Sequence, residues 1–405
     1  MLSTMLRAGF ASIDITPDQQ FSLMGYDFRW TELPPGNSGV HDPLAARVLA
    51  LDDGGGPALL VSMDICVIHV DLAREMRRRL AKKAGTSADR VLVATTHTHS
   101  GPYPQLPGRK GKPKDRKQAA MRRLNEQYAQ LLLDRVETAA AVAAGKLHPV
   151  SVRAAEAPLG IGYNRRVKVD GKVRMCWNPL EFSDLRPQPS PDPTCTVLVF
   201  REPHGPRQYV LFSLGAHPVC LGKTSRQVSG DWPGLACRMI DQQLPGTRSM
   251  FFLGACGEVH PWIATQEDPQ QLVPVASAAA GMVQLLVASG AGEKPTDATI
   301  RIAARTWKRG KLQLDLAAWR IGPATILSAP VELFASLSAQ LRMRVPSPLF
   351  LVTLGNGWTG YWPDRAAFDE GAYEIGATWA IKKGDGEKLI DRLAELAREL
   401  GAARR

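Results

Sequence analysis

The sequence predicts an α/β protein with mixed β-sheets flanked by helices. Short apolar runs alternate along the 405-residue chain with longer segments whose apolar residues recur at helical spacing. Polar residues that could bind a metal or move protons directly follow several of the short runs. Open α/β sheets build their ligand crevices at strand ends, so we expect a functional site there.

Six apolar runs predict strands, at 58–63, 91–95, 150–155, 195–200, 208–214 and 250–254. Helices are expected at 70–84, 121–144, 267–289 and 387–400. In the first of these, Leu72, Met76 and Leu80 recur every four residues beside an arginine-rich face, as in a helix with one buried side. The alternation of the two kinds of segment favours the α/β class, and no repeat of fixed period is evident.

The most informative motif is Thr-Thr-His-Thr-His-Ser-Gly-Pro at residues 95–102, directly after an apolar run. If the strand continues through the motif, His97 and His99 point the same way and could bind one ion. If the chain turns there, one histidine could bind a metal while the other meets substrate. Backbone hydrogen bonds could also hold such a pair without any metal.

Three further groups of polar residues favour a metal site. His217 follows one strand-like run, Glu258 and His260 follow another, and Asp231 comes after a Ser-Gly turn. Residues that gather at neighbouring strand ends can meet in one crevice even when they lie far apart in the sequence.

The order of motifs resembles that of the catalytic domain of the neutral (non-lysosomal) ceramidase family. The resemblance rests on Asp14-Ile15-Thr16-Pro17, Met24-Gly25-Tyr26, Gly39-Val40-His41-Asp42-Pro43-Leu44, the His-Thr-His-Ser-Gly-Pro block, Tyr361 and Tyr373. These motifs span nearly the whole chain, and the two-histidine block is the most specific. The family consists of zinc-dependent amidases that cleave N-acyl sphingosine, so the resemblance implies a zinc enzyme with the family's α/β fold.

The resemblance implies zinc ligands at His97, His217, Glu332 and Tyr361. Imidazole and carboxylate bind zinc readily, and a displaceable position can hold the water that attacks the substrate. A tyrosine ligand is less usual, because the cation must deprotonate or strongly polarise its phenol. Taken alone, Glu332 could instead be an acid at the N-terminus of a helix formed by the amphipathic stretch 331–337.

The resemblance also places His99, Arg165 and Tyr373 against the substrate, where they would polarise its carbonyl and stabilise an oxyanion. For each of these residues the sequence also allows a structural role without contact to substrate. Arg165 lies beside Arg166 in what could be a solvated basic loop. The tyrosines lie in an aromatic-rich stretch that could be core or a substrate wall.

One departure from the family pattern bears on the chemistry. The family has a serine at its reaction centre where this chain has His260. Histidine supplies no hydroxyl but can transfer a proton near neutral pH, so we expect His260 or Glu258 to handle protons. Asp64 and Asp231 could orient the metal-binding histidines, or could be ordinary strand-end and turn acids.

These expectations define a zinc-dependent hydrolase that cleaves an N-acyl or peptide-like amide bond of a non-ceramide substrate with zinc-activated water. Because fold does not fix chemistry, an ester, lactone or glycosidic bond is an alternative target. A non-catalytic, metal-stabilised binding protein is the third alternative. Tests of metal content and turnover distinguish the three.

The candidate site residues span most of the chain, so we expect one catalytic domain over 1–405, without the family's separate carboxy-terminal β domain. The formal net charge is +11, and residues 105–124 carry eight basic residues and one acidic residue, a net +7. This segment reads as a solvated loop and a possible lid that could attract an anionic small-molecule substrate. It lacks interleaved aromatic residues, so nucleic-acid binding is not expected.

The six cysteines have no paired short spacing and are expected to be reduced core thiols. The amino terminus shows no secretory pattern, and no run approaches about 20 apolar residues. We therefore expect a cytoplasmic protein without membrane association.

Overall fold

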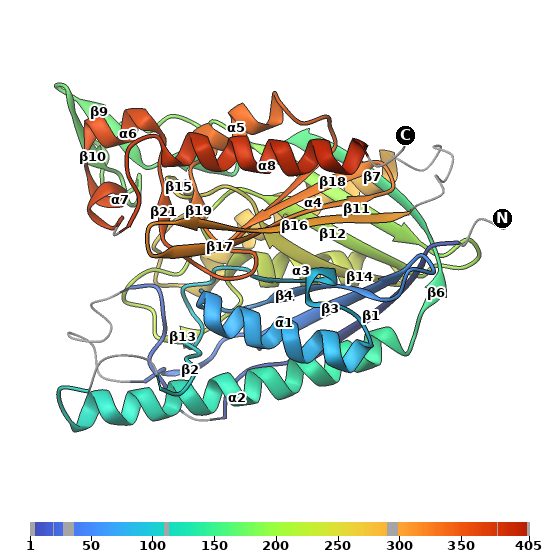
Figure 1. Ribbon diagram of the computed structural model, residues 1–405. Helices are drawn as coiled ribbons and strands as arrows, with labels where there is room; N and C mark the ends of the chain where they lie inside the picture. Colours follow the sequence, from blue (N-terminus) through green and yellow to red (C-terminus); the bar gives the residue numbers. More distant parts are fainter. Residues whose placement is uncertain are drawn as a thin grey trace.

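Three mixed β-sheets form the centre of the molecule, and helices cover their outer faces (Figure 1). The computed structural model describes residues 5–18, 20–26, 36–108, 113–289, 299–378 and 380–402. The predicted fold class is confirmed.

Each sheet combines antiparallel strands with one parallel pair. The first has the order β5 (Val91–Thr95), β4 (Ala58–Met63), β3 (Ala45–Asp52), β1 (Arg7–Asp14), β6 (His148–Pro149). The second has the order β14 (Thr247–Leu253), β12 (Gln208–Leu214), β11 (Thr194–Arg201), β7 (Ser151–Pro158). The third has the order β16 (Ile300–Arg309), β17 (Leu312–Ile321), β18 (Ala324–Ala329), β20 (Leu349–Thr353). The parallel pairs are β4 with β5, β12 with β14 and β18 with β20.

A parallel pair needs a crossover connection, and a helix lies in each one. The crossover helices are α1 (Val70–Ala84), α3 (Asp231–Gln243) and α5 (Ala335–Arg342). Each packs with a second helix over its own sheet: α2 (Arg116–Ala144), α4 (Leu272–Ser289) and α8 (Asp385–Ala402), respectively. A helix pair therefore buries the outer face of every sheet.

The inner faces of the three sheets share one core. Leu60 and Leu92 of the first sheet pack in the same cluster as Phe252 of the second and Trp319 and Phe350 of the third. This shared core fixes the three sheets relative to one another, so the ends of their parallel strands converge on one region.

Short elements complete the chain around that region. Four two-stranded pairs are β2 (Gly39–Val40) with β13 (Gln227–Val228), β8 (Gly162–Asn164) with β15 (Val259–Pro261), β9 (Arg166–Val169) with β10 (Lys172–Met175), and β19 (Glu332–Leu333) with β21 (Tyr361–Trp362). Two short helices are α6 (Arg365–Glu370) and α7 (Tyr373–Gly376), and 3₁₀ turns lie at Ala88–Arg90 and Pro269–Gln271.

All six expected strands and four expected helices are confirmed, with shifts of a few residues at their ends. The main difference is in the basic segment, of which residues 109–112 lie outside the described part. Residues 116–124 are helical rather than loop, because Asp115 caps α2 by accepting a hydrogen bond from the Gln118 amide at 2.7 Å. All six cysteines are buried and unpaired, as expected.

The helix α4 with the turn before it, Pro269–Ser289, is apolar throughout. Within the described residues it is the one helix long and apolar enough to cross a membrane, with a mean hydropathy of 1.8. Its Leu272, Val275, Val283 and Leu286 pack in the core of the second sheet, however, and a core helix of a globular protein meets the same criterion.

Candidate active site and metal centre

The polar residues expected to form a site gather where the parallel pairs of all three sheets end. His97 follows β5, His217 follows β12, His260 follows β14 and Glu332 follows β18. The carboxyl ends of parallel strands lie at one edge of a sheet, and the shared core brings three such edges together.

His97 lies after a turn rather than within the strand. The strand β5 ends at Thr95, and His97 has a φ of 72°, in the left-handed region that non-glycine residues rarely adopt. The alternative in which the chain turns between the histidines is therefore the observed one. Because the Cys66 carbonyl only accepts hydrogen bonds, Nδ1 of His97 donates to it at 2.9 Å, and Nε2 keeps its lone pair.

His217 is oriented in the same manner. Its Nδ1 donates to the Val259 carbonyl oxygen at 3.0 Å, which again leaves the lone pair on Nε2. The indole N–H of Trp232 donates to the carbonyl oxygen of His217 at 3.2 Å. Backbone carbonyls thus set the tautomers of both histidines.

Glu332 meets the two imidazoles. Its Oε2 lies 3.4 Å from Nε2 of His97 and 3.3 Å from Nε2 of His217. Its other oxygen, Oε1, accepts a hydrogen bond of 2.7 Å from the indole N–H of Trp358. All three side chains are buried, and the two Nε2 atoms and Oε2 make no hydrogen bond within the described part of the chain. Leaving such atoms unsatisfied costs about 1–3 kcal/mol each, so the arrangement fits a bound cation.

The charges of the trio suit a metal. Burial lowers the pKa of His217 to about 4, which keeps its imidazole neutral near pH 7. Burial would raise the pKa of Glu332, but His97 and His217 hold it well below its usual range. Burial lowers the pKa of His97, but Cys66 and Glu332 together raise it well above its usual value, so a cation bound here would have to displace a proton from that imidazole. A neutral imidazole and an ionised carboxylate are the forms that bind metal, and this mixed N/O set is one that zinc accepts.

A second group of possible ligands, Cys66 with His97 and His99, overlaps the first. Sγ of Cys66 lies 3.5 Å from Nδ1 of His97, the nitrogen already engaged with a carbonyl. The trio of His97, His217 and Glu332 is therefore the better cation site.

Tyr361, the fourth expected ligand, lies in register beside Glu332 across the β19–β21 pair. It is half-buried, and burial raises its pKa well above the ordinary tyrosine value. A bound cation would have to reverse that shift for the phenolate to form. Its role as a ligand stays a prediction.

His99 completes the histidine cluster. Its ring centre is 4.9 Å from that of His97 and 5.9 Å from that of His217. The Met-Gly-Tyr turn covers it: Tyr26 meets its ring edge-on at 5.0 Å, and a Cβ on Gly25 would lie 2.3 Å from its Cγ. The glycine in this motif is therefore required for close packing against His99.

Arg165 is buried rather than solvated. Its Nε donates to Oε1 of Glu374 at 2.8 Å, and its NH2 nitrogen donates to the Gly257 carbonyl at 2.8 Å. Glu374 also accepts from Arg166 at 2.8 Å, so one buried carboxylate holds two arginines. The basic-loop alternative for this segment is wrong.

Three aromatic rings surround the Arg165 guanidinium. Its central carbon is 5.1 Å from the ring of Trp177, 5.7 Å from that of Tyr361 and 5.6 Å from that of Tyr373. Tyr373 is 48% exposed and forms the outer edge of the group. The two tyrosines are therefore partly exposed beside Arg165 and do not belong to the buried core.

The structure gives His260 a different role from the expected one. Its Nδ1 donates to the Trp177 carbonyl at 3.0 Å, so its Nε2 must accept the 2.7 Å hydrogen bond from Arg165. Burial, and then Arg165, lower its pKa well below the usual value. With both nitrogens engaged, this imidazole holds Arg165 in place, and proton transfer by His260 stays a prediction.

Glu258 lies away from the cluster. Its carboxylate accepts hydrogen bonds from the amides of Ala335 at 2.9 Å and Ser336 at 3.3 Å, at the N-terminus of α5. The helix-terminal acid is therefore Glu258 and not Glu332, and proton transfer by Glu258 stays a prediction.

The two expected orienting acids do not contact the imidazoles. Asp231 accepts hydrogen bonds from the Cys220, Leu221 and Trp232 amides, which fixes the loop after His217. Asp64 forms a buried ion pair with Arg47. Sequence reasoning missed the residues that do support the site, Cys66, Trp177, Trp358 and Glu374. Only the position of Glu374 next to Tyr373 offered a signal.

Two solved structures are similar to this chain over nearly its whole length. The neutral ceramidase from Pseudomonas aeruginosa matches with a TM-score of 0.75 and 17% identity, over 98% of this chain and 75% of that one. A structure described as ceramidase complexed with C2 matches with a TM-score of 0.74 and 16% identity, over 98% and 76%. At this identity the likeness concerns the fold, which is that of the ceramidase-type hydrolases.

The sequence places the chain within that class. Residues 6–325 match the family model described as neutral/alkaline non-lysosomal ceramidase, N-terminal. The protein belongs to this family. Glu332, Tyr361 and Tyr373 lie beyond the matched segment, and the structure places Glu332 against the histidines and both tyrosines beside Arg165.

Proposed function

We propose that the protein is a zinc-dependent hydrolase that cleaves the amide bond of an N-acyl or peptide-like small molecule other than ceramide. The observation that carries the proposal is the convergence of Nε2 of His97, Nε2 of His217 and Oε2 of Glu332 within 4.8 Å of one another. Bound there, zinc would act as a Lewis acid and lower the pKa of water to about 7.

The remaining residues supply orientation and charge. The Arg165 guanidinium lies beside the rings of Tyr361 and Tyr373, where it can bind the carbonyl oxygen of a substrate. His260 and Glu374 hold that guanidinium from two sides. His99 lies beside the metal ligands His97 and His217 and can donate to or accept from a substrate group there.

The side chains around Arg165 support a non-ceramide substrate. In place of the serine expected from the family pattern stands His260, whose ring nitrogens are both engaged. Trp177, Tyr361 and Tyr373 form a group of contacting rings beside Arg165, and such rings suit a flat or polar group better than a long aliphatic chain. Glu374 and Glu370 together pair with Arg165 and Arg166, so this arginine does not by itself call for an anionic substrate.

The test measures zinc content and turnover together. Metal analysis by mass spectrometry should find about one zinc per chain in the parent protein and loss of it in His97→Ala and His217→Ala, because each substitution removes a ligand. His204→Ala, at an exposed position, is the matched control and should keep its metal. The zinc-loaded parent should hydrolyse a short N-acyl amino acid amide faster than ceramide, with the corresponding ester as a third substrate.

A folded parent protein that holds no metal and takes none up on reconstitution would contradict the proposal. Faster turnover of the ester or of ceramide would leave the metal centre standing and overturn the proposed bond or substrate. If removal of zinc unfolds the protein and the zinc-loaded protein turns over none of the three substrates, a metal-stabilised binding protein is favoured.

A further inference from the structure

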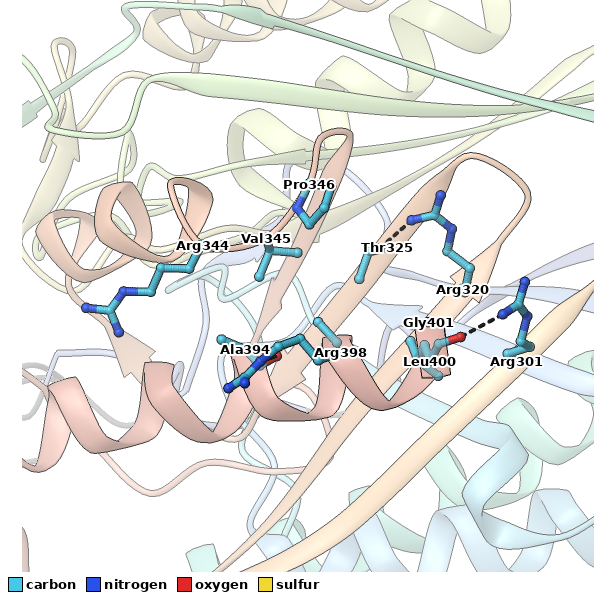
Figure 2. Close-up of a pocket in the computed structure, with 11 residues that line it drawn as sticks. Arg301, Arg320, Thr325, Arg344, Val345, Pro346, Ala394, Arg398, Leu400 and Gly401 are labelled. Carbon is cyan, nitrogen blue, oxygen red and sulfur yellow. Dashed lines mark hydrogen bonds between the residues drawn. The ribbon is translucent and has the colours of Figure 1, made fainter. Parts of the chain in front are cut away.

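A second cavity lies far from the metal ligands, between the third sheet and the C-terminal end of α8 (Figure 2). Its volume is about 450 Å³. Its lining residues are Arg301, Arg320, Thr325, Arg344, Val345, Pro346, Ala394, Ala397, Arg398, Leu400 and Gly401. Four of these are arginines, and none of the described residues that line the cavity is Asp or Glu.

Two of the arginines face each other directly. Arg301 of β16 is the register partner of Arg320 of β17. Like charges at opposed positions of an antiparallel pair destabilise a sheet. No described carboxylate lies within ion-pair distance of either guanidinium. Burial and the charge of Arg301 lower the pKa of Arg320, a direct sign of the uncompensated charge.

Neutral groups orient this pair. Arg301 donates to the Leu400 carbonyl at 2.7 Å, and Arg320 donates to Oγ1 of Thr325 at 2.9 Å and to the Gly322 carbonyl at 3.1 Å (Figure 2). These bonds fix the side chains but leave their charges unneutralised, so both are held ready for an anion.

The opposite side of the cavity adds two more guanidiniums. Arg398 of α8 donates to the Ala394 carbonyl of its own helix at 3.4 Å. Arg344 forms an exposed ion pair of 2.5 Å with Asp391. Positive charge therefore approaches the cavity from the sheet and from the helix, and only one of the four arginines has a described carboxylate partner.

We propose that this cavity binds a phosphate monoester with a small apolar group attached. A phosphate dianion has three terminal oxygens that can accept from guanidiniums on two sides, and arginine matches its geometry through paired N–H groups. Val345, Pro346, Ala397 and Leu400 give the rest of the cavity an apolar wall. The volume falls in the range of small-molecule sites and exceeds what a lone phosphate fills.

The site is separate from the candidate active site. The helix α8 begins beside Pro363, next to the β21 strand that carries Tyr361, and the cavity lies at its other end (Figure 1). Eighteen helical residues span about 27 Å, so a ligand here touches none of the metal-site residues. The proposal is therefore independent of the one made for the metal centre.

Calorimetric titration of the whole protein with hexyl phosphate and with inorganic phosphate, at constant ionic strength set with chloride, tests this site. We expect hexyl phosphate to bind more tightly than inorganic phosphate, and Arg301→Gln and Arg320→Gln each to weaken hexyl phosphate at least tenfold. Arg305→Gln is the matched control, because Arg305 lies on the same strand but pairs with Glu399 outside the cavity. Its affinity should equal that of the parent.

The two variants should fold well, since each removes one of two opposed charges, and we expect their Tm without ligand to equal or exceed the parent's. No binding of either probe to the parent, or equal binding by the parent and both variants, would overturn the proposal. A pelleting assay with vesicles containing phosphatidic acid shows whether the phosphate monoester is a lipid headgroup or a soluble molecule. Arginine-dependent pelleting indicates a lipid headgroup, and hexyl phosphate binding without pelleting indicates a soluble monoester.

Discussion

Oε2 of Glu332 lies 3.4 Å from Nε2 of His97, although 234 residues separate the two along the chain. Both atoms are buried and unpaired by hydrogen bonds within the described residues. His97 reaches this position with a positive φ, and strained backbone of this kind persists where the surrounding structure enforces it. The pair is the clearest sign that the site is organised for a ligand that the protein alone does not supply.

Trp358 should control metal affinity without binding metal. Its indole N–H holds Oε1 of Glu332 at 2.7 Å, which leaves Oε2 for the histidines. Trp358→Phe removes this hydrogen bond, and we expect zinc to bind about 10–100-fold more weakly in a competition titration with a chelator. Trp262→Phe is the control, because its indole donates to the Gly160 carbonyl instead. Equal affinity in Trp358→Phe and the parent would show that this bond does not orient the carboxylate.

His260 should act through Arg165. His260→Ala removes the acceptor at 2.7 Å from the guanidinium, and a displacement of about 1 Å can cost roughly 100-fold in kcat. His260→Gln offers an amide oxygen in place of Nε2 and should recover a large part of the lost activity. Both variants should retain zinc and the parent's pH profile. If the glutamine variant is as inactive as the alanine variant and the pH profile loses a limb, His260 transfers protons after all.

Gly25, which packs against the His99 ring, should be essential for activity. In Gly25→Ala the new Cβ would lie 2.3 Å from Cγ of His99, so the imidazole must move. Overpacking of this kind costs about 1–3 kcal/mol, and we expect a lower Tm together with a loss of kcat. Gly39→Ala is the control, since Gly39 also has a positive φ but has no atom within 4 Å of the built Cβ. Similar losses of kcat in the two variants would mean that backbone strain, not contact with His99, is responsible.

Glu258 should make stability fall as the pH rises. Burial raises its pKa from 4.5 to about 7, so the folded protein keeps a proton that the unfolded chain releases. The free energy of unfolding should therefore decrease between pH 4.5 and 7, by about 3 kcal/mol in total for this group. Glu258→Gln cannot titrate, so its urea midpoint relative to the parent's should be higher at pH 8 than at pH 5. The substitution Glu395→Gln, at a partly exposed position of α8, is the control. An equal offset of Glu258→Gln at both pH values would contradict the assignment.

Much of the fold follows from local pattern. The strands β4 and β5 and the helix α1 appear where the sequence predicts them, because their apolar residues repeat with the periods of a buried strand and of a one-sided helix. The basic stretch that continues as the first turns of α2 was harder to assign, since a charged segment can be loop or exposed helix and only the Asp115 cap distinguishes them.

The types of residue at the site were predictable from the sequence, but the role of each residue was not. Placing histidines and acids at strand ends needs only the local sequence, and the family resemblance supplied the set that contains His97, His217 and Glu332. Which acid caps a helix, however, depends on the sheet packed beside it. Glu258, which follows strand β14 of the second sheet, reaches the N-terminus of α5, the helix that covers the third sheet. Because Glu258 caps this helix, the Glu332 carboxylate can face the histidines.

The sequence by itself determined the class of the fold, the positions of most elements and the kinds of side chain at the strand ends, because periodicity and turn residues act over short stretches of chain. The tertiary structure decided which of those side chains meet. The shared core of Leu92, Phe252 and Phe350 fixes three sheets against one another. Long-range packing therefore sets the geometry around Glu332 and engages both nitrogens of His260, and neither relationship is encoded in a local pattern.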